Sequence, residues 1–429
     1  MSGSSDSREH AARILSRVDS AGAHAARLLG EASPATRELV LGALRWQRTL
    51  DHLLAPFLRQ PLATLDPPVR VLLRLGLYEA LRLRTPAPVA VAEAVRVARV
   101  LAAPASGLVN AVLRRAVAVR WPAEDDESLS LGERFSHPDW LVERWRAALG
   151  SDATRTALAA DQLAAPLSVL ASPRAVSELR AAGCELAPHP WSALVNVVTA
   201  KAAAAVRVVA AGGAYALDPT AALVATLAPI VAGRVIDLTA APGGKVLSLA
   251  ATGVAGWLVG ADRHLGRVNM LRRNRQAHLC PGPVLAMDGE RPALRPASFD
   301  LVIVDAPCSG TGTLRRHPEI RWRLQPSHLG ELATAQRRLV QGACELVAPG
   351  GYLLYSTCSL EPEENEQVVG SLRFEAIRLG DRLPDGVPFR ERPGGGIVIP
   401  PTALGDGFTV HLRRRQPLAG ETIPVRGSG

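Results

Sequence analysis

The sequence predicts an α/β protein in which a sheet-containing domain follows an all-α bundle and a small α+β insert. Three observations predict this class. Residues 1–122 show helical spacing of apolar residues, residues 123–213 mix helix and strand signals, and residues 214–429 alternate strand-like and helix-like runs. At 429 residues the chain is also too long for one ordinary hydrophobic core. These three ranges are therefore the predicted domains.

The first range reads as a bundle of amphipathic helices. Ser33 is placed to cap a helix that has Pro34 at its first position. In the stretch beginning "DPPVRVLL", apolar and small residues recur at helical spacing: Val69, Leu72, Leu73, Gly76 and Ala80. The range holds 17 arginines against nine acidic residues, a net charge of +8. A solvated basic surface and an RNA-docking module explain this charge equally well.

The middle range begins with an acidic, polar stretch, "WPAEDDESLSLGE" at 121–133, which reads as a linker. It continues with helix-like "PDWLVERWRAAL" and the short strand candidates "PLSVLAS" and "AVRVV". This mixture predicts a small α+β subdomain between the linker and residue 213.

From residue 214 onward, five apolar runs alternate with helix-like stretches. The runs are "RVIDL", "GWLVGAD", "PVLAMD", "FDLVIVDAP" and "GGYLLYSTCS". This spacing predicts βαβ units and a parallel sheet covered by helices on both faces. Ligands of such sheets bind at the carboxyl ends of the strands, where the acids and two of the cysteines of this range occur.

Composition excludes several classes of protein. With 48% hydrophobic and 21% charged residues the chain is typical of globular proteins, and it has no uninterrupted apolar run long enough to span a membrane. The opening residues lack the pattern of a secretory signal, so we expect a cytoplasmic location. Five cysteines without a C-x-x-C pair predict neither a disulfide framework nor a zinc site. Of the 49 basic residues all but two are arginines, which suits contacts with nucleic acid.

The run "VIDLTAAPGGKVLSLA" at 235–250 combines a strand, a glycine turn and a helix. Gly243 and Gly244 allow the backbone to pass close to a ligand, and the helix that follows presents free amide groups. Asp262 ends the next strand, where a carboxylate can accept both hydroxyls of a ribose, and Asp288 ends the third, facing an adenine edge. Each acid alone is more often a loop or cap residue. Acids at successive strand ends after a glycine turn predict a nucleoside cofactor.

Three motifs make a family resemblance specific. "DLTAAPGGK", "DAPCSGTG" and "YSTCSLEPEENE" resemble the cofactor loop, fourth motif and sixth motif of the RNA 5-methylcytosine methyltransferases. "LRLGLYEALRL", "AVAEAVRVAR" and "LVNAVLRR" are similar to the helical domain of the antitermination factor NusB. A NusB-like domain before the catalytic part is the arrangement of the bacterial ribosomal RNA enzymes of the Sun/Fmu/RsmB type. The resemblance covers nearly the whole chain.

The resemblance implies a Rossmann-like domain that uses S-adenosylmethionine to methylate carbon 5 of a cytidine in RNA, with 16S ribosomal RNA as the expected substrate. It implies no metal. Thr239 stands where the family commonly has cysteine, a change that keeps a small side chain. The residues implied in cofactor binding are Thr239, Ala240, Ala241, Pro242, Gly243, Gly244, Lys245, Asp262, Asp288 and Asp305.

This reaction requires a cysteine. Carbon 5 of cytosine becomes nucleophilic only after a thiolate adds to carbon 6, and a second cysteine can help release the product. Spacing leaves open whether Cys308 or Cys358 is the nucleophile, and the Pro-Cys pair of DNA enzymes favours Cys308. Resemblance to the RNA family implies Cys358, with Cys308 promoting release. The buried-thiol interpretation applies to the other three: Cys184, Cys280 and Cys344.

Two further side chains are candidates for the same site. Asp305 closes the strand before Cys308, and the resemblance sets it beside the cofactor and the cytosine edge, where a carboxyl can bond the exocyclic amine or ring nitrogen 3. Lys245 either steers the base or the cofactor carboxylate, or is a solvated lysine at a helix start.

The stretch "LRRHPEIRWR" after the fourth motif offers phosphate donors and a stacking surface to an unstacked base. Its predicted RNA contacts are Arg315, Arg316, Arg321, Trp322 and Arg323, and the alternative is an exposed basic loop. Two other functions compete with RNA methylation. A methyltransferase acting on protein or small molecules leaves both cysteines without purpose, and a non-catalytic RNA-binding factor predicts degraded motifs, whereas these are intact.

Overall fold

A computed structural model describes residues 2–229, 231, 233–253 and 257–417. The described residues form two compact units. Unit 1 comprises 1–164 and 314–324, and unit 2 comprises 165–313 and 325–429. The chain therefore leaves unit 2 after Thr313, contributes a short segment to unit 1, and returns at Gln325. The predicted boundaries at residues 122 and 213 differ from these unit boundaries.

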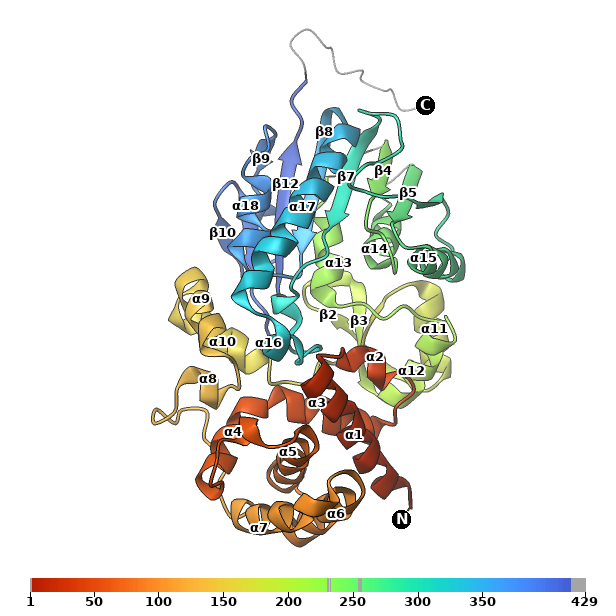
Figure 1. The fold of residues 1–429 in the computed structure, drawn as a ribbon. Helices are drawn as coiled ribbons and strands as arrows, with labels where there is room; N and C mark the ends of the chain where they lie inside the picture. The colour runs from red at the N-terminus through yellow and green to blue at the C-terminus, as the bar shows by residue number, and fades with distance from the viewer. Residues whose placement is uncertain (1, 230, 232, 254–256, 418–429) are drawn as a thin grey trace. The chain divides into compact units, whose positions relative to one another are not determined.

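Unit 1 is all-helical in its described residues, as the spacing predicts (Figure 1). Its α-helices are α1 (Ser2–Ala21), α2 (Ala25–Leu29), α3 (Pro34–Arg45), α4 (Gln47–Leu54), α5 (Pro67–Leu81), α6 (Ala87–Leu101), α7 (Ser106–Ala116), α8 (Leu131–Arg134), α9 (Asp139–Leu149), α10 (Ser151–Ala160) and α16 (Ile320–Arg323). Short 3-10 turns cover Ala55–Phe57, Leu62–Thr64 and Ala103–Ala105. The predicted cap is confirmed, because the Ser33 hydroxyl accepts a hydrogen bond from the Thr36 amide at 3.2 Å.

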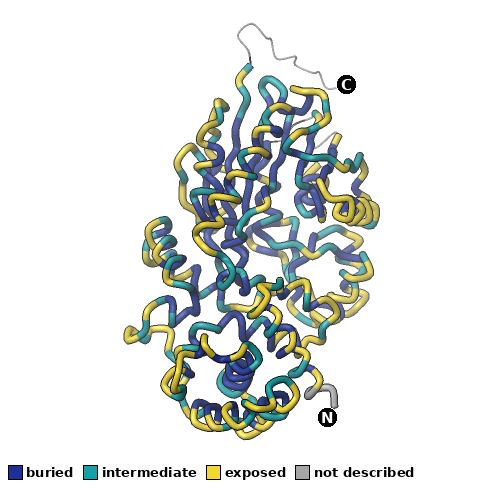
Figure 2. The backbone as a smooth tube through the Cα atoms, viewed as in Figure 1, coloured by how far each residue is buried: buried dark blue, intermediate teal, exposed yellow. Residues whose placement is uncertain are grey.

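Helix α5 is the centre of the bundle, and Figure 2 shows it buried along most of its length. It packs against α1, α3, α4, α6 and α7. Gly76 is required there, since a Cβ at this position would lie 2.6 Å from a methyl carbon of Leu113 on α7. A helix that is apolar nearly all round is expected to be surrounded by others.

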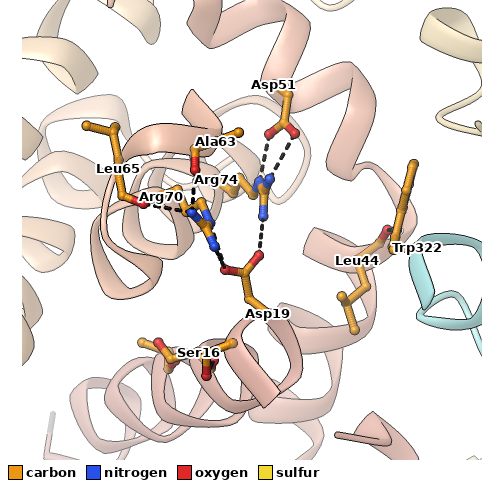
Figure 3. Close-up of polar contacts among 11 residues, drawn as sticks. Ser16, Asp19, Leu44, Asp51, Ala63, Leu65, Arg70, Arg74 and Trp322 are labelled. Atoms are coloured by element: carbon orange, nitrogen blue, oxygen red, sulfur yellow. Dashed lines mark hydrogen bonds and ion pairs between the residues drawn. The ribbon is translucent and has the colours of Figure 1, made fainter. Parts of the chain in front are cut away.

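Two arginines of α5 carry charge into this interior (Figure 3). The Arg74 guanidinium donates to Asp51 at 2.6 and 2.9 Å and to Asp19 at 3.2 Å. Arg70 donates to the other oxygen of Asp19 at 2.7 Å. Positive and negative charges therefore neutralise each other inside unit 1.

Residues 121–164 belong to unit 1, although the sequence predicts a linker at 121–133. The Trp121 ring meets the Trp46 ring edge to face at 4.9 Å, and Arg134 donates to the carbonyls of Glu124 and Leu129. A buried His137–Asp161 contact of 3.2 Å ties the later helices together. These side-chain contacts hold an acidic, turn-rich stretch that composition alone assigns to a linker.

Unit 2 contains a small three-stranded sheet and a large one within its described residues. The small antiparallel sheet has the order β1 (Ser168–Leu170), β3 (Ser192–Ala200), β2 (Glu185–His189). It is accompanied by α11 (Pro173–Ala181) and α12 (Ala202–Ala210). An α+β character is therefore present from residue 165 to 213, but this part joins the large sheet rather than forming a unit with residues 123–164.

The large sheet is mixed. The five predicted runs form its parallel part, in the order β8 (Val347–Thr357), β7 (Phe299–Asp305), β4 (Arg234–Asp237), β5 (Trp257–Asp262), β6 (Val284–Ala286). An antiparallel extension, which the sequence analysis does not anticipate, continues beyond β8: β9 (Glu375–Ile377), β10 (Arg390–Arg392), β11 (Gly396–Ile399) and β12 (Phe408–Arg414). Among the described strands, the chain places β5 and β6 on one side of β4 and then β7 and β8 on the other, so the strand order reverses at β4.

Helices cover both faces of the parallel part, as predicted (Figure 1). One face packs on α13 (Pro219–Thr226), α14 (Gly244–Thr252) and α15 (Leu265–Ala277), and the other on α17 (Pro326–Leu346) and α18 (Glu366–Val369). Neighbouring residues such as Val235 and Ile236 point to opposite faces and are both fully buried. Short 3-10 turns cover Thr311–Thr313, Pro362–Glu364 and Gly380–Arg382. No helix in the described ranges is both long and apolar enough to cross a membrane.

Candidate active site

The acids and the cysteines predicted from sequence come from the carboxyl ends of the parallel strands. Strands β4, β5 and β7 end at Asp237, Asp262 and Asp305. Asp305 is the register partner of Ser356 near the end of β8, and Cys358 follows that strand directly. Because parallel strands end at the same edge of a sheet, these side chains gather at the edge where ligands of such sheets bind.

The turn after β4 has the backbone that the sequence predicts for a ligand loop. Gly243 has a φ of +127°, a conformation that L side chains rarely adopt, and a Cβ there would lie 3.2 Å from Leu271. Gly244 then begins α14, whose first amides have no partner within the helix. Ala240 and Ala241 are buried, and Pro242 is exposed. The turn thus combines small residues with backbone amides at the start of a helix, and the Gly244 backbone is hydrogen-bonded to the Tyr215 hydroxyl.

Lys245 is buried and bonded to a strand-end acid, so the interpretation as a solvated lysine at a helix start is wrong. Its side chain is 6% exposed, and Nζ lies 2.7 Å from a carboxylate oxygen of Asp305. The other Asp305 oxygen accepts a hydrogen bond from the Ser356 hydroxyl at 3.0 Å. The Asp305 side chain keeps 36% of its surface exposed. Its carboxylate is therefore oriented by two partners and still accessible.

The sequence analysis missed Asp237 and underrated Thr239. The Thr239 amide donates to the Asp237 carboxyl at 3.0 Å, and the Thr239 hydroxyl accepts from the Asp305 amide at 2.9 Å. Thr239 therefore joins the ends of β4 and β7. Asp237 is buried, and burial raises its pKa to about 7. The available signal was its position at the end of a strand immediately before the glycine turn.

The two predicted ribose and adenine acids differ in their surroundings. Asp262 is 5% exposed, accepts from the His264 amide at 3.0 Å and pairs with Arg267 at 3.1 Å. Arg267 also donates to the Ala241 carbonyl, which links Asp262 to the glycine turn. Asp288 follows β6, is half-buried, and accepts from the Glu290 amide at 3.0 Å. Both carboxylates are fixed by local hydrogen bonds.

The structure brings the two motif cysteines together. The Sγ atoms of Cys308 and Cys358 lie 3.4 Å apart, although 50 residues separate them in the chain. Both side chains are half-buried and carry free thiols. The pKa of Cys308 is raised well above its usual value, chiefly by its hydrogen bond to Cys358, then by burial and by the negative charges of Cys358, Glu364 and Asp305. Cys308 therefore remains a neutral thiol at physiological pH.

The other three cysteines lie away from this pair. Cys184 and Cys280 are buried, and Cys344 is half-buried on α17, where burial raises its pKa to about 12. All three are free thiols, which agrees with the buried-thiol interpretation. Among the described residues, no three His, Cys, Asp or Glu side chains are grouped as a metal site would require.

The predicted RNA-contact stretch falls in the segment 314–324, which belongs to unit 1. Arg321 is 1% exposed, and its guanidinium donates to the carbonyls of Ser136, Arg45, Leu314 and Asp161. Burial lowers its pKa to about 10. Arg321 therefore joins these backbone segments inside unit 1 and does not present a hydrogen-bond donor at the surface.

The remaining members of that stretch are divided between interior and surface. Arg315 is 3% exposed, and the Trp322 indole donates to the Leu44 carbonyl at 2.7 Å, as Figure 3 shows. Arg316 is exposed, and Arg323 is half-buried with a 2.7 Å contact to His24. Sequence pattern did not separate these roles, because an arginine bonded to carbonyls and one exposed to water look the same in a sequence.

Comparison with known proteins now gives the family. The model of 16S rRNA methyltransferase RsmB/F matches residues 224–382, and that of the NusB family matches residues 5–118. The chain is 35% identical over 381 residues to ribosomal RNA small subunit methyltransferase B of Thermus thermophilus, covering 88% of this chain and 87% of that protein. The chain belongs to the RsmB/F family of 16S rRNA methyltransferases.

Other relatives agree with this membership. Ribosomal RNA small subunit methyltransferase B of Pseudomonas putida is 34% identical over 395 residues, covering 84% of this chain and 87% of the relative. The crystal structure of PH0851 matches with a TM-score of 0.74 at 22% identity, over 95% of this chain and 99% of that one. The structural match shows that nearly the whole chain shares the fold of that protein. The family models and the relatives confirm the resemblance drawn from the motifs.

Proposed function

We propose that this chain transfers a methyl group from S-adenosylmethionine to carbon 5 of a cytidine in small-subunit ribosomal RNA, through a covalent bond between Cys358 and the base. The observation that carries the proposal is the 3.4 Å separation of the Cys308 and Cys358 sulfurs. The ion pair of Lys245 and Asp305 belongs to the same strand-end edge. A methyl transfer to oxygen or nitrogen needs no thiol, whereas methylation of carbon 5 of cytosine needs one thiolate to add to the ring, and a second thiol can help release the product.

The residues around the glycine turn fit S-adenosylmethionine. Asp262 supplies carboxylate oxygens for ribose hydroxyls, and Asp288 supplies acceptors for the adenine edge. Gly243 leaves room that a Cβ would partly fill beside Leu271. Lys245, which pairs with Asp305, lies at the start of α14, where a cationic side chain and the amides of a helix start suit the carboxylate end of the cofactor. The cofactor supplies an electrophilic methyl group on a sulfonium.

Cys358 acts as the nucleophile in this proposal. Its thiolate forms a bond to carbon 6 of the cytosine, and the ring electrons move to carbon 5, which takes the methyl group. The Asp305 carboxylate accepts a hydrogen bond from the exocyclic amine of the base, and Lys245 and Ser356 hold that carboxylate in place. Loss of the carbon 5 proton then restores the double bond and releases Cys358.

Cys308 promotes this release because its proton affinity changes during the reaction. In the free protein the hydrogen bond with Cys358 and the negative charge of Cys358 both raise the Cys308 pKa. Once the Cys358 sulfur is bonded to carbon 6, both causes disappear and the Cys308 pKa falls. Cys308 can then pass its own proton to water and, as a thiolate, accept the proton from carbon 5. The second cysteine becomes a base only after the adduct has formed.

In the segment 314–324, fewer residues are candidates for RNA contact than the sequence predicts. Arg316 is the exposed arginine of the predicted set, and Arg323 is half-buried. We assign the phosphate contacts to these two, since Arg315 and Arg321 are enclosed in unit 1. The NusB-like helices carry most of the chain's net positive charge and supply further contacts that are not specific for sequence.

The test is direct. The purified protein is incubated with unmethylated 16S ribosomal RNA and methyl-labelled S-adenosylmethionine, and the RNA is digested to nucleosides and analysed by mass spectrometry. We expect label in 5-methylcytidine. Bisulfite sequencing of ribosomal and transfer RNA from cells with and without the gene then locates the cytidine. Label in any other nucleoside, or in protein alone, refutes the proposal.

A further inference from the structure

Glu364 is a fully buried carboxylate that the reaction outlined above does not use. One of its oxygens accepts from the Ser309 amide at 2.8 Å and from the Gln336 side chain at 3.0 Å. The other oxygen accepts from the hydroxyls of Ser309 and Ser359. Four hydrogen bonds therefore converge on one side chain, all from donors without charge.

The two serines that donate to Glu364 are neighbours of the two motif cysteines in the chain. Ser309 directly follows Cys308, and Ser359 directly follows Cys358. The same carboxylate therefore holds the residue after each active-site cysteine. Gln336 extends the link, because its amide also donates to the Pro307 carbonyl at 2.8 Å, on the other side of Cys308.

We propose that Glu364 is a positioning residue for the methyl transfer: its carboxylate holds the turn after each cysteine and so sets the separation of the two thiols and the protonation of Cys308. This proposal rests on the function proposed above. Two backbone hydrogen bonds, one on each side of the turn at 307–310, also join this part of the chain to residues 356–358. Ala306 donates to Ser356 at 2.9 Å, and Gly312 donates to the Cys358 carbonyl at 2.8 Å. Between these links, Glu364 holds Ser309.

Other side chains fold the Glu364 loop itself, which separates a local structural role from this one. Asn365 donates to the carbonyls of Ser359 and Glu361 and accepts from the Thr357 hydroxyl at 2.7 Å. The Tyr355 hydroxyl donates to the Glu364 carbonyl at 2.6 Å. The loop therefore has its own hydrogen bonds. The Glu364 carboxylate takes no part in these bonds. It instead joins the loop to the turn after Cys308, through Ser309.

The charge of Glu364 acts on Cys308. Its partners in the described residues are neutral, so no cation in contact cancels the negative charge, and that charge contributes to the raised pKa of Cys308. A Cys308 that stays protonated can donate to the Cys358 sulfur, which lies 3.4 Å away. Glu364 thus acts on Cys308 both through the hydrogen bonds that hold its turn and through its charge.

The experiment compares Glu364→Gln with Glu366→Gln in the full-length protein. Glutamine keeps the shape of Glu364 but removes its charge and reverses some of its hydrogen bonds. Glu366 is a matched control, because it lies two residues further along, is 12% exposed, and pairs with Arg392 at 3.1 Å rather than with either serine. Circular dichroism, the melting temperature and cofactor affinity are measured for both variants to establish folding.

The first readout uses no RNA. Alkylation of Cys308 by iodoacetamide is followed by peptide mass spectrometry as a function of pH. We expect Glu364→Gln to move the Cys308 curve to lower pH, since a negative charge facing that thiol is lost. A purely structural defect would instead raise the alkylation of both cysteines at every pH. A Cys308 curve equal to that of the wild type and Glu366→Gln overturns the proposal.

The second readout is steady-state methylation. We expect Glu364→Gln to lower kcat at least about tenfold, as for one lost charged hydrogen bond, with KM for RNA changed less than about threefold. Equal kcat in Glu364→Gln and wild type overturns the positioning role. If the wild type forms no 5-methylcytidine, the function proposed above fails, while the alkylation curves still decide whether Glu364 controls Cys308.

A second variant covers the case in which Glu364→Gln does not fold. The Ser309→Ala, Ser359→Ala double variant removes both hydroxyl contacts and leaves the carboxylate in place. We expect its kcat to fall at least about fivefold with KM for RNA nearly unchanged, from the loss of two neutral hydrogen bonds to a charged group. Wild-type kcat in the double variant contradicts the proposal.

Discussion

Two networks, one in each unit, bury charge in different ways. In the α5 network of unit 1, Arg74 donates to both Asp51 and Asp19, and Arg70 pairs with Asp19, so each charge of this network has an opposite charge beside it. In unit 2, Asp237 and Glu364 are buried among amides, hydroxyls and a side-chain amide. Both arrangements satisfy hydrogen bonds, but only the first neutralises charge locally.

From this difference we infer a structural role for the network of unit 1 and a role in the proposed reaction for that of unit 2. Paired charges cancel at a distance and hold helices together, and removing one partner leaves the other buried and unpaired. A carboxylate solvated by neutral donors keeps its field, which changes the proton affinity of its neighbours. In unit 2, the hydrogen bond to Cys358 and burial are the main causes of the raised pKa of Cys308, and the negative charge of Glu364 adds to them, whereas the pKa of Asp237 is raised chiefly by burial.

The largest effect is expected at the two cysteines of unit 2 to which the proposed reaction is assigned. Cys358→Ala should abolish methylation and leave S-adenosylmethionine binding nearly intact, because the thiolate touches the base and not the cofactor. Cys308→Ala should instead leave the protein covalently bound to its RNA, visible as a slowly migrating band on a denaturing gel. If Cys308→Ala prevented the adduct and Cys358→Ala accumulated it, the two roles would be exchanged.

Next in size is the pH dependence that burial of the Asp237 carboxyl imposes on stability. Asp237 has a pKa of about 7 when folded, against 3.8 when unfolded. Between these values the unfolded state binds fewer protons, so the free energy of unfolding falls as pH rises. A rise of this size corresponds to about 4 kcal/mol lost across that window. Asp237→Asn should remove this loss, as measured by urea unfolding at pH 4.5 and 7.5.

The substitution keeps the local hydrogen bond, since asparagine can still accept from the Thr239 amide. A difference in pH dependence between the two proteins is then due to ionisation of Asp237. If wild type and Asp237→Asn showed the same pH dependence, Asp237 would be ionised throughout and unit 2 would neutralise it as unit 1 neutralises its carboxylates.

A smaller loss of stability is expected from breaking the paired network of unit 1. Arg74→Met leaves Asp51 and Asp19 without their shared cation. Their side chains are 31% and 15% exposed, so water compensates in part. We expect the low end of the cost of breaking a buried pair, about 3 kcal/mol, measured by urea unfolding.

The matched control for this substitution is Arg13→Met, which removes an exposed pair with Glu9 on α1. It should cost less than about 0.5 kcal/mol. Equal stability of the two variants would mean that the interior network of unit 1 contributes no more than a surface ion pair.

The smallest effect concerns the exposed arginine of the segment 314–324. Arg316→Gln should reduce the slope of log RNA affinity against log salt by roughly 0.7–0.9, the value for one phosphate contact, with the melting temperature unchanged. Arg321→Gln should leave the salt slope unchanged and lower the melting temperature, because its carbonyl partners lose their donor. A lower salt slope in folded Arg321→Gln would return that residue to the RNA contact.

The sequence by itself determined the architecture of the parallel sheet, because each strand there is a short apolar run that ends in an acid or a cysteine. It also determined the α3 cap, the glycine turn and the family, since these depend on residues close together in the chain. The acids of the site could be found for the same reason: a strand end marks them. Local patterns are enough where the physical cause is local.

Only the tertiary structure decided which distant groups meet. The Cys308–Cys358 contact joins residues 50 apart, and Glu364 joins the serines that follow them. The same holds for Arg321, whose sequence neighbourhood is that of a basic loop but whose guanidinium is surrounded by carbonyls. Burial and charge compensation are properties of the whole fold, and a guanidinium or carboxylate changes its role according to whether water, an opposite charge or a neutral donor surrounds it.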